Sequence, residues 1–459
     1  MSDIPLQAAP ARTGWLDYRT IWRWHFYAGL FCVPFIILLS LSGMLYLFKP
    51  QVEAFIDRPY EGLHITGQPA DADAQALAAV AAVPGGRLKS YILPTAPDSA
   101  VRVAVADGHG ALWRVYVHPQ TLAILNKVAE EDRFMAVVKS IHGELLMGDR
   151  GSLLVELAAC WGIVMIVSGL YLWWPRGGQG MAGVLYPRLR AGSRTFWRDI
   201  HAVVGMWLSF IALFLLLTGL PWATVWGAGF KAVRQATGTA AVGGQDWTTS
   251  RTATRATDME GHDHGDGADM MVGAVSLTDI VTTAMTFNMP APVLISPPNG
   301  KDKPWTVRSM TQNRPNRVGA DLDATTGAVL RQEGFADRHI IDRAVGIGIA
   351  AHEGQLFGPA NQALGVLAAL GLVLLSVSGV VMWWKRRPQG ALGAPPPLRI
   401  KGSPTVMAGL LLFFALFLPV LGASLLLVAL LEWVVLRSLP RARRWLGLRP
   451  VALSQGTVA

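Results

Sequence analysis

The chain has 459 residues, of which 52% are hydrophobic and only 15% are charged, with two cysteines and a formal net charge of +9. Since an average soluble domain carries roughly 25% charged residues, this composition excludes a disordered chain and a disulfide scaffold and indicates an integral membrane protein. The arginines gather at the ends of apolar runs, where positive charge sets membrane topology. We therefore expect membrane lipid, and no nucleic acid, around this charge.

Five apolar stretches are long enough to cross the membrane, which takes about 20 helical residues. They cover residues 26–48, 153–174, 201–226, 361–384 and 406–436. The first follows a short basic segment, residues 1–25, and no small-residue cleavage site comes after it. We interpret it as a retained span rather than a signal peptide.

Positive charge also predicts the orientation of the spans. Lysines and arginines crowd the two short connections, residues 175–200 and 385–405, and short loops of this kind face the cytoplasm. We therefore expect a multi-pass protein of the bacterial inner membrane with a cytoplasmic N-terminus. Residues 49–152 and 227–360 then lie in the periplasm.

The fifth stretch, residues 406–436, does not fit this scheme simply. A single span would place the arginines of the tail, residues 437–459, outside the cytoplasm, against the usual bias. Pro419 and Gly422 fall in its middle, so a single bent helix and a short hairpin that returns to the cytoplasm both remain open. Of the two, we favour the bent helix.

The sequence repeats itself. With an offset of 210, the second span and the residues before it match the fourth span without a gap: His142 with His352, Ser168-Gly169 with Ser378-Gly379, and Trp173-Trp174 with Trp383-Trp384. With an offset of 176, the first span matches the third: His25 with His201, Gly29 with Gly205, and Ser42-Gly43 with Thr218-Gly219. Each half is then a span, an outer segment and a second span, in a parallel repeat. The tryptophan pairs are typical of an aromatic belt at the cytoplasmic interface.

Each outer segment combines one helix with short strands separated by turn signals. We predict helices over residues 75–83 and 277–287, and strands over residues 87–93, 100–106, 112–118, 293–296, 305–310 and 317–323. A His- and Gly-rich insertion, residues 238–271, lengthens the second segment. The predicted fold is an α-helical membrane bundle of two tandem halves, with four core spans, a C-terminal hydrophobic segment and two periplasmic α+β modules.

Four of the ten histidines recur at matched positions: His25, His201, His142 and His352. An ionisable residue at the end of a span is a candidate functional residue. The predicted depths pair His25 with His201 at the cytoplasmic side and His142 with His352 at the outer side. Two facing imidazoles are what a six-coordinate b-type haem requires, so we expect two haems. The absence of a C-x-x-C-H motif excludes covalent attachment through that motif.

Glycines follow two of these histidines. Gly29 and Gly205 lie one turn after His25 and His201 on the same helix face. A flat macrocycle approaches closely where a side chain is missing, although close helix packing explains such glycines equally well. The Ser-Gly and Thr-Gly pairs at the other ends of the spans are interpreted as packing features or mild bends.

Other chemistry is less well supported. A zinc site needs about four clustered ligands, whereas these histidines divide between two membrane faces. Cys32 and Cys160 lie inside spans as small hydrophobes, and Glu156 could relay protons. His262 and His264 could bind a divalent metal weakly, but a mobile linker is the preferred interpretation. No nucleotide-binding motif is visible, so electrons would come from a quinol or a separate cytosolic reductase.

Two runs, His142-Gly-Glu-Leu-Leu-Met-Gly148 and Gly169-Leu-Tyr-Leu-Trp-Trp-Pro-Arg176, resemble the PepSY-associated transmembrane-helix (PepSY-TM) proteins, as do Arg198-Asp-Ile-His201 and His352-Glu-Gly-Gln-Leu-Phe-Gly358. The outer segments are similar to PepSY domains, and the resemblance extends to about residue 436. The family includes inner-membrane reductases that carry two b haems and reduce ferric siderophores. The resemblance therefore implies a haem-dependent ferric-siderophore (ferric-chelate) reductase, with the four matched histidines as axial ligands of the haem iron.

Two alternatives from other classes remain open. A haem-free transporter or permease for a metal or a siderophore would use the repeat for alternating access, but the spans contain few polar groups near their centres. A PepSY regulator of an extracytoplasmic protease would not need four matched histidines.

Overall fold

The computed structural model describes residues 18–175, 180–239, 275–300, 303–394, 409, 412, 413 and 416–448. Nearly all of the predicted insertion, with His262 and His264, lies outside these residues. The chain divides into two compact units. Unit 1 contains residues 1–40, 153–217 and 370–459, and unit 2 contains residues 41–152 and 218–369.

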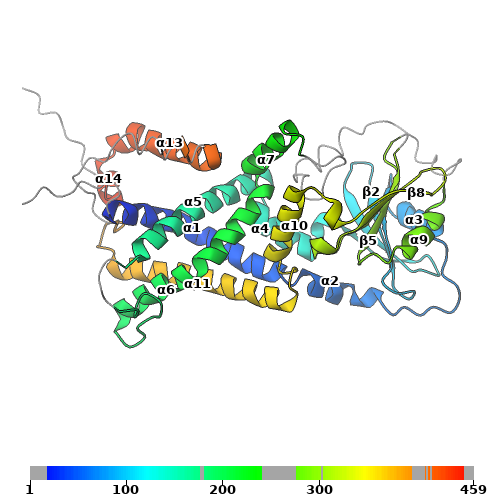
Figure 1. The fold of residues 1–459 in the computed structure, drawn as a ribbon, viewed down its shortest axis with the longest axis horizontal. Coiled ribbons are helices and arrows are strands. Elements are labelled where there is room, and N and C mark those ends of the chain that lie inside the picture. The colour runs from blue at the N-terminus through cyan, green and yellow to red at the C-terminus, as the bar shows by residue number, and fades with distance from the viewer. Residues whose placement is uncertain are drawn as a thin grey trace, which may run out of the picture. The chain divides into compact units, whose positions relative to one another are not determined.

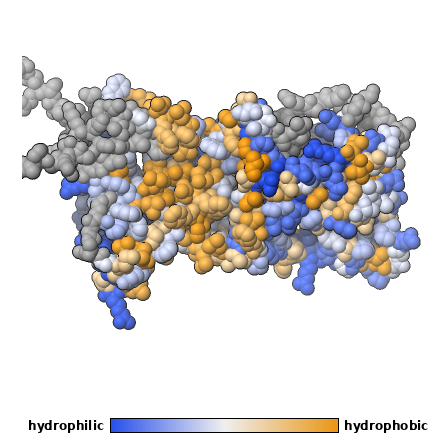
Figure 2. Space-filling view, in the orientation of Figure 1, coloured by the Kyte–Doolittle hydropathy of each residue, from blue (hydrophilic) through white to orange (hydrophobic). Residues whose placement is uncertain are grey.

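Four long helices correspond to the first four predicted spans. They are α1 (Tyr18–Tyr46), α5 (Asp149–Trp173), α6 (Ser193–Gly219) and α11 (Pro359–Arg386) (Figure 1). Each is long and apolar enough to cross a membrane. Apolar side chains dominate the surface over these helices, whereas hydrophilic side chains are common over the sheet (Figure 2). The chain is a multi-pass membrane protein with an α-helical membrane part.

The strands of both outer segments form one continuous antiparallel sheet in unit 2. The eight strands lie in the order β4-β3-β2-β1-β5-β6-β7-β8. Their bounds are β1 Arg87–Ile92, β2 Val101–Ala106, β3 Leu112–Val117, β4 Ile124–Ala129, β5 Val293–Ser296, β6 Trp305–Ser309, β7 Gly319–Leu322 and β8 Val329–Glu333. Strand β1 pairs with β5, with Tyr91 opposite Ile295. The expectation of two separate outer modules therefore needs correction, because the two segments share a sheet.

Two helices, α3 (Ala72–Ala81) and α9 (Leu277–Thr286), pack beside the sheet (Figure 1). Their buried side chains join those of the central strands in a single hydrophobic core. The Asp73 carboxylate of α3 accepts the backbone N–H groups of Leu277 and Thr278, both at 3.0 Å. One carboxylate therefore satisfies N–H groups in the first turn of α9, which have no partner inside that helix.

Four further helices of unit 2 were not predicted as separate elements. They are α2 (Lys49–Asp57), α4 (Phe134–Glu144), α7 (Thr224–Ala236) and α10 (Ile340–His352). Short 3₁₀ turns lie between these helices and strands, η1 Arg58–Tyr60, η2 Glu130–Asp132, η3 Leu220–Trp222, η4 Arg314–Asn316 and η5 Phe335–Asp337, and a sixth, η6 Leu436–Ser438, lies in unit 1. Helices α4 and α10 matter most for the site, because each ends near one of the matched histidines.

The C-terminal part of unit 1 contains two short helices, α13 (Pro419–Val434) and α14 (Pro440–Leu446). Helix α13 is apolar but has only 16 residues. At 1.5 Å per residue it is about 24 Å long, shorter than the roughly 30 Å hydrocarbon core of a bilayer.

Candidate site formed by two histidine pairs

The first histidine pair joins α1 and α6 within unit 1. The rings of His25 and His201 face each other with centroids 6.2 Å apart and planes at 83°. Each Nδ1 is fixed by a neighbouring helix: that of His25 donates to the Met165 carbonyl oxygen at 3.0 Å, and that of His201 to the Leu375 carbonyl oxygen at 3.1 Å. A carbonyl can only accept, so Nδ1 carries the proton and Nε2 keeps its lone pair.

The second histidine pair joins α4 and α10 within unit 2. The rings of His142 and His352 have centroids 6.5 Å apart and planes at 88°. Ser42 Oγ lies 3.1 Å from His142 Nδ1, and Thr218 Oγ1 lies 2.9 Å from His352 Nδ1. Burial, and secondly the nearby His142, lowers the pKa of His352 to about 4. His352 is therefore neutral at pH 7, the form that binds a metal.

The spacing of both pairs suits one metal ion between two imidazoles. A metal–nitrogen bond of about 2 Å on each side, with each nitrogen about 1 Å from its ring centroid, places the two centroids about 6 Å apart. Among the described residues, no group of three or more His, Cys, Asp or Glu side chains could hold a metal. Two ligands are too few for a zinc site, but they fit an iron whose other four ligands come from a porphyrin. His25 with His201, and His142 with His352, would hold haem b.

A hydroxyl-glycine pair faces each of the four imidazoles, which the sequence interpretation missed. Besides Ser42 and Thr218, Ser168 Oγ lies 3.1 Å from His25 Nδ1 and Ser378 Oγ lies 3.0 Å from His201 Nδ1. We interpreted these pairs as packing features or mild bends, and that interpretation was incomplete, because each pair also contacts a histidine. The signal was available in the repeat, since every matched histidine has a matched hydroxyl-glycine pair.

The glycines of these pairs leave room for the imidazole rings. A Cβ on Gly43 would lie 2.9 Å from His142 Cε1, and one on Gly169 would lie 3.0 Å from His25 Cε1. The corresponding distances are 3.4 Å for Gly379 to His201 and 3.9 Å for Gly219 to His352. Alanine would therefore displace the ring at the first two positions and only touch it at the fourth.

Gly29 and Gly205 lie on the helices that carry the first histidine pair. A Cβ on Gly29 would contact only Met165 Sδ, at 3.9 Å, and one on Gly205 would contact Leu375 Cδ2 at 3.4 Å. Neither contact is closer than an ordinary van der Waals contact, so close helix packing does not require a glycine at either position.

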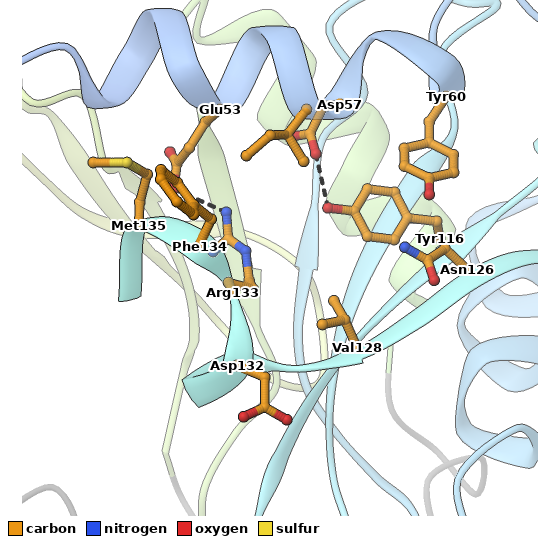
Figure 3. Close-up of a pocket in the computed structure, with 11 residues that line it drawn as sticks. Glu53, Asp57, Tyr60, Tyr116, Asn126, Val128, Asp132, Arg133, Phe134 and Met135 are labelled. Atoms are coloured by element: carbon orange, nitrogen blue, oxygen red, sulfur yellow. Dashed lines mark hydrogen bonds and ion pairs between the residues drawn. The ribbon is translucent and has the colours of Figure 1, made fainter. Parts of the chain in front are cut away.

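Helix α4 begins at a network of charges from α2 and η2. Arg133, just before α4, donates to Glu53 at 2.9 Å and to Glu130 at 2.6 Å. Beside this network the buried Asp57 accepts from the Tyr116 hydroxyl at 2.8 Å (Figure 3). Glu53, Asp57, Tyr116 and Arg133 line a cavity of about 150 Å³. The partners of Arg133 and Asp57 all lie in the first outer segment, residues 49–152. The Arg133 contacts therefore anchor the start of α4, the helix that carries His142.

Helix α10 is held differently. Asp342 accepts two hydrogen bonds from the Arg234 guanidinium of α7, at 2.5 and 3.0 Å, and both side chains are buried. Gly348 lets α10 approach the end of α6, because a Cβ there would lie 3.0 Å from Thr218 Cγ2. The same Thr218 contacts His352, so the approach of the two helices also places the hydroxyl.

The remaining predicted residues contribute less. Cys32 and Cys160 are buried free thiols, and Glu156 is buried within α5. The two members of each tryptophan pair have different surroundings. Trp173 Nε1 donates to the Val184 carbonyl oxygen at 2.9 Å and Trp383 Nε1 to the Leu392 carbonyl oxygen at 2.7 Å, so the first member of each pair holds the following loop. The second members, Trp174 and Trp384, are exposed.

These features define a class of protein: a multi-pass helical membrane protein with two facing histidine pairs. The family model described as the PepSY-associated TM region matches residues 22–386, and the chain belongs to this family. The predicted family is thus confirmed. No curated protein shows a significant match to the chain.

Proposed function

We propose that the protein is a di-haem b oxidoreductase of the bacterial inner membrane. It accepts electrons from a quinol or a cytosolic reductase and reduces a ferric siderophore or another iron chelate in the periplasm. The observation that carries this proposal is the spacing of the two pairs, 6.2 and 6.5 Å between ring centroids. Bound haem b would supply a one-electron couple at each pair.

The protein itself would fix the position of the imidazoles and set the basicity of their Nε2 atoms. The carbonyl and hydroxyl partners at Nδ1 fix the ring orientation and raise the basicity of Nε2, as partners of metal-bound histidines usually do. Reduction serves iron release because hard oxygen ligands favour ions of higher charge. The protein then needs no acid or base catalyst, only a donor held at a suitable potential.

The first experiment is a visible spectrum of the detergent-purified protein, oxidised and dithionite-reduced, with pyridine haemochrome quantitation. We expect sharp b-type bands and about two haems per chain, the number that four axial histidines allow. His25→Ala and His352→Ala should each remove about one haem. His109→Ala, which changes an exposed histidine in a turn of the outer segment, should remove none.

The reductase activity needs its own measurement. Reduced protein in proteoliposomes should be reoxidised by a ferric chelate, with Fe(II) trapped by ferrozine, and the His352→Ala variant should lose most of this rate. A colourless wild-type protein, expressed with ample haem, would contradict the proposal and favour transport or regulation. If the protein binds haem but no ferric chelate reoxidises it, the cofactor part of the proposal would stand and the substrate part would be overturned.

A further inference from the structure

The C-terminal helices lie outside the residues that the family model covers, and their contacts define a path through the membrane part of unit 1. The first turns of α13 lie beside the middle of α5. Trp161 Nε1 donates to Ser424 Oγ at 3.2 Å, and Trp161 is twelve residues from either end of α5. Leu421, one turn before Ser424, is fully buried.

The chain then returns to the end at which α1 begins. Glu432, near the end of α13, pairs with Arg443 of α14 at 3.5 Å. Helix α14 ends against the first turns of α1, where the Tyr27 hydroxyl donates to the Leu446 carbonyl oxygen at 2.5 Å and Arg23 donates to the Gly447 carbonyl oxygen at 3.1 Å. From Ser424 to Val434 the helix rises about 15 Å, half of the hydrocarbon core.

Before the C-terminal helices, the described chain at Leu392 also lies at that same end. Helix α11 finishes at Arg386, and shortly after it the Leu392 N–H donates to the Trp445 carbonyl oxygen of α14 at 2.9 Å. The chain is therefore at this end at Leu392, beside the middle of a span at Ser424, and back at this end at Leu446. A single span across the membrane does not fit these three positions.

We propose that the C-terminal region is a re-entrant arm. Helix α13 starts near the middle of the membrane and runs back to the end at which α1 begins. There α14 packs against α1 and braces it, that is, holds it in place. Arg23 and Tyr27 are one turn apart on α1, and His25 lies between them on the opposite face. Arg23 and Tyr27 are thus positioning residues that hold the helix carrying His25. The arm also returns Arg441, Arg443 and Arg444 to the side of the other basic loops, which the positive-inside bias favours.

The path of the arm is tested by cysteine labelling in intact and permeabilised cells with a membrane-impermeant maleimide. Ser438→Cys lies between α13 and α14 and is exposed. Arg190→Cys marks the loop between α5 and α6, and Thr121→Cys marks the outer sheet; both positions are exposed. The wild type, with its two buried cysteines, gives the background. We expect Ser438→Cys to be labelled only under the conditions that label Arg190→Cys. Labelling together with Thr121→Cys would overturn the re-entrant path.

The bracing role rests on the proposed haem sites and needs a second measurement. Tyr27→Phe removes one hydrogen bond to α14, and we expect haem to leave the first histidine pair for apomyoglobin about five-fold faster. Transfer from the second pair should not change, and neither rate should change in the control Tyr186→Phe, an exposed tyrosine of the same unit. Equal rates in Tyr27→Phe and wild type would overturn the brace. A wild type without haem would refute the proposed function but leave the labelling result standing.

Discussion

Each of the four imidazoles meets a hydroxyl from a residue that directly precedes a glycine. The hydroxyl lies within hydrogen-bond distance of Nδ1, and the glycine leaves room for the Cε1 edge of the ring, most tightly at Gly43 and Gly169. The combination matters because a histidine ring can rotate about two bonds, whereas a metal requires its nitrogen to lie within a few tenths of an ångström. The hydroxyl and the glycine together remove that freedom.

Thr218 tests the role of the hydroxyl. Thr218→Val keeps the shape but removes the oxygen 2.9 Å from His352 Nδ1. We expect haem affinity at the second pair to fall about ten-fold or more, the usual effect of losing such a partner. Thr218→Ser keeps the oxygen and should stay near wild type. Equal haem transfer rates in the valine and serine variants would contradict this role.

Gly43 and Gly219 test the space left for the rings. Gly43→Ala brings a Cβ to 2.9 Å from His142 Cε1, whereas Gly219→Ala brings one only to 3.9 Å from His352 Cε1. Overpacking costs about 1–3 kcal/mol, so the first variant should lose haem from the second pair about ten-fold faster. The second variant should behave as wild type. Equal rates of haem loss from Gly43→Ala and Gly219→Ala would show that neighbouring residues shift to remove the clash at Gly43.

The sequence predicted which histidines come together, because the repeat and the span ends provide depth as well as residue type. It did not predict the hydroxyl-glycine pairs as partners of the histidines. A serine and a glycine within a span are also the residues that allow helices to pack closely, so residue type alone cannot distinguish the two roles. The contacts between the histidine rings and the hydroxyl-glycine pairs join separate helices, so they produce no pattern in the local sequence.

At the scale of elements, the helices that carry the second pair are held by charge. The two helices are anchored differently: α4 by the partly exposed Arg133 network, and α10 by the buried pair of Arg234 and Asp342. Removing one member of a buried pair leaves the other charge without compensation, which is strongly destabilising.

Asp342→Asn tests this anchoring. We expect a loss of about 3–5 kcal/mol in unfolding free energy, the range measured when one partner of a buried pair is removed. Asp321→Asn breaks the more exposed pair with Arg308 and should cost less than about 1 kcal/mol. The midpoints of thermal unfolding in detergent compare the two. Similar midpoints for both variants would mean that α10 is held mainly by its apolar contacts.

The predicted elements of the outer segments agree closely with the structure where the strands are buried. Strand β5 has the predicted bounds, and β1, β2 and β3 differ from prediction by one residue at an end. The outermost strands, β4 and β8, were missed because none of their side chains is buried and they lack an apolar alternation. The pairing of β1 with β5 joins residues about 200 positions apart, and no local sequence feature encodes such a contact.

At the scale of the whole molecule, each histidine pair takes one imidazole from each half of the sequence. Fragments 1–179 and 180–459 each contain one member of both pairs. We expect the co-expressed fragments to bind two haems per fragment pair, and either fragment as a monomer to bind none. Pyridine haemochrome quantitation after purification through a tag on one fragment measures this. A monomeric fragment that binds haem alone would contradict the cross-half pairing.

The outer sheet, like the histidine pairs, needs residues from both halves of the chain. Its two central strands, β1 and β5, come from different halves, so a half-length chain would expose an unpaired strand edge, which invites association with another chain. A half-length chain would therefore need a second copy of itself to complete the sheet and to bring two imidazoles together. Within one polypeptide the two halves can differ, and the separate anchoring of α4 and α10 is such a difference.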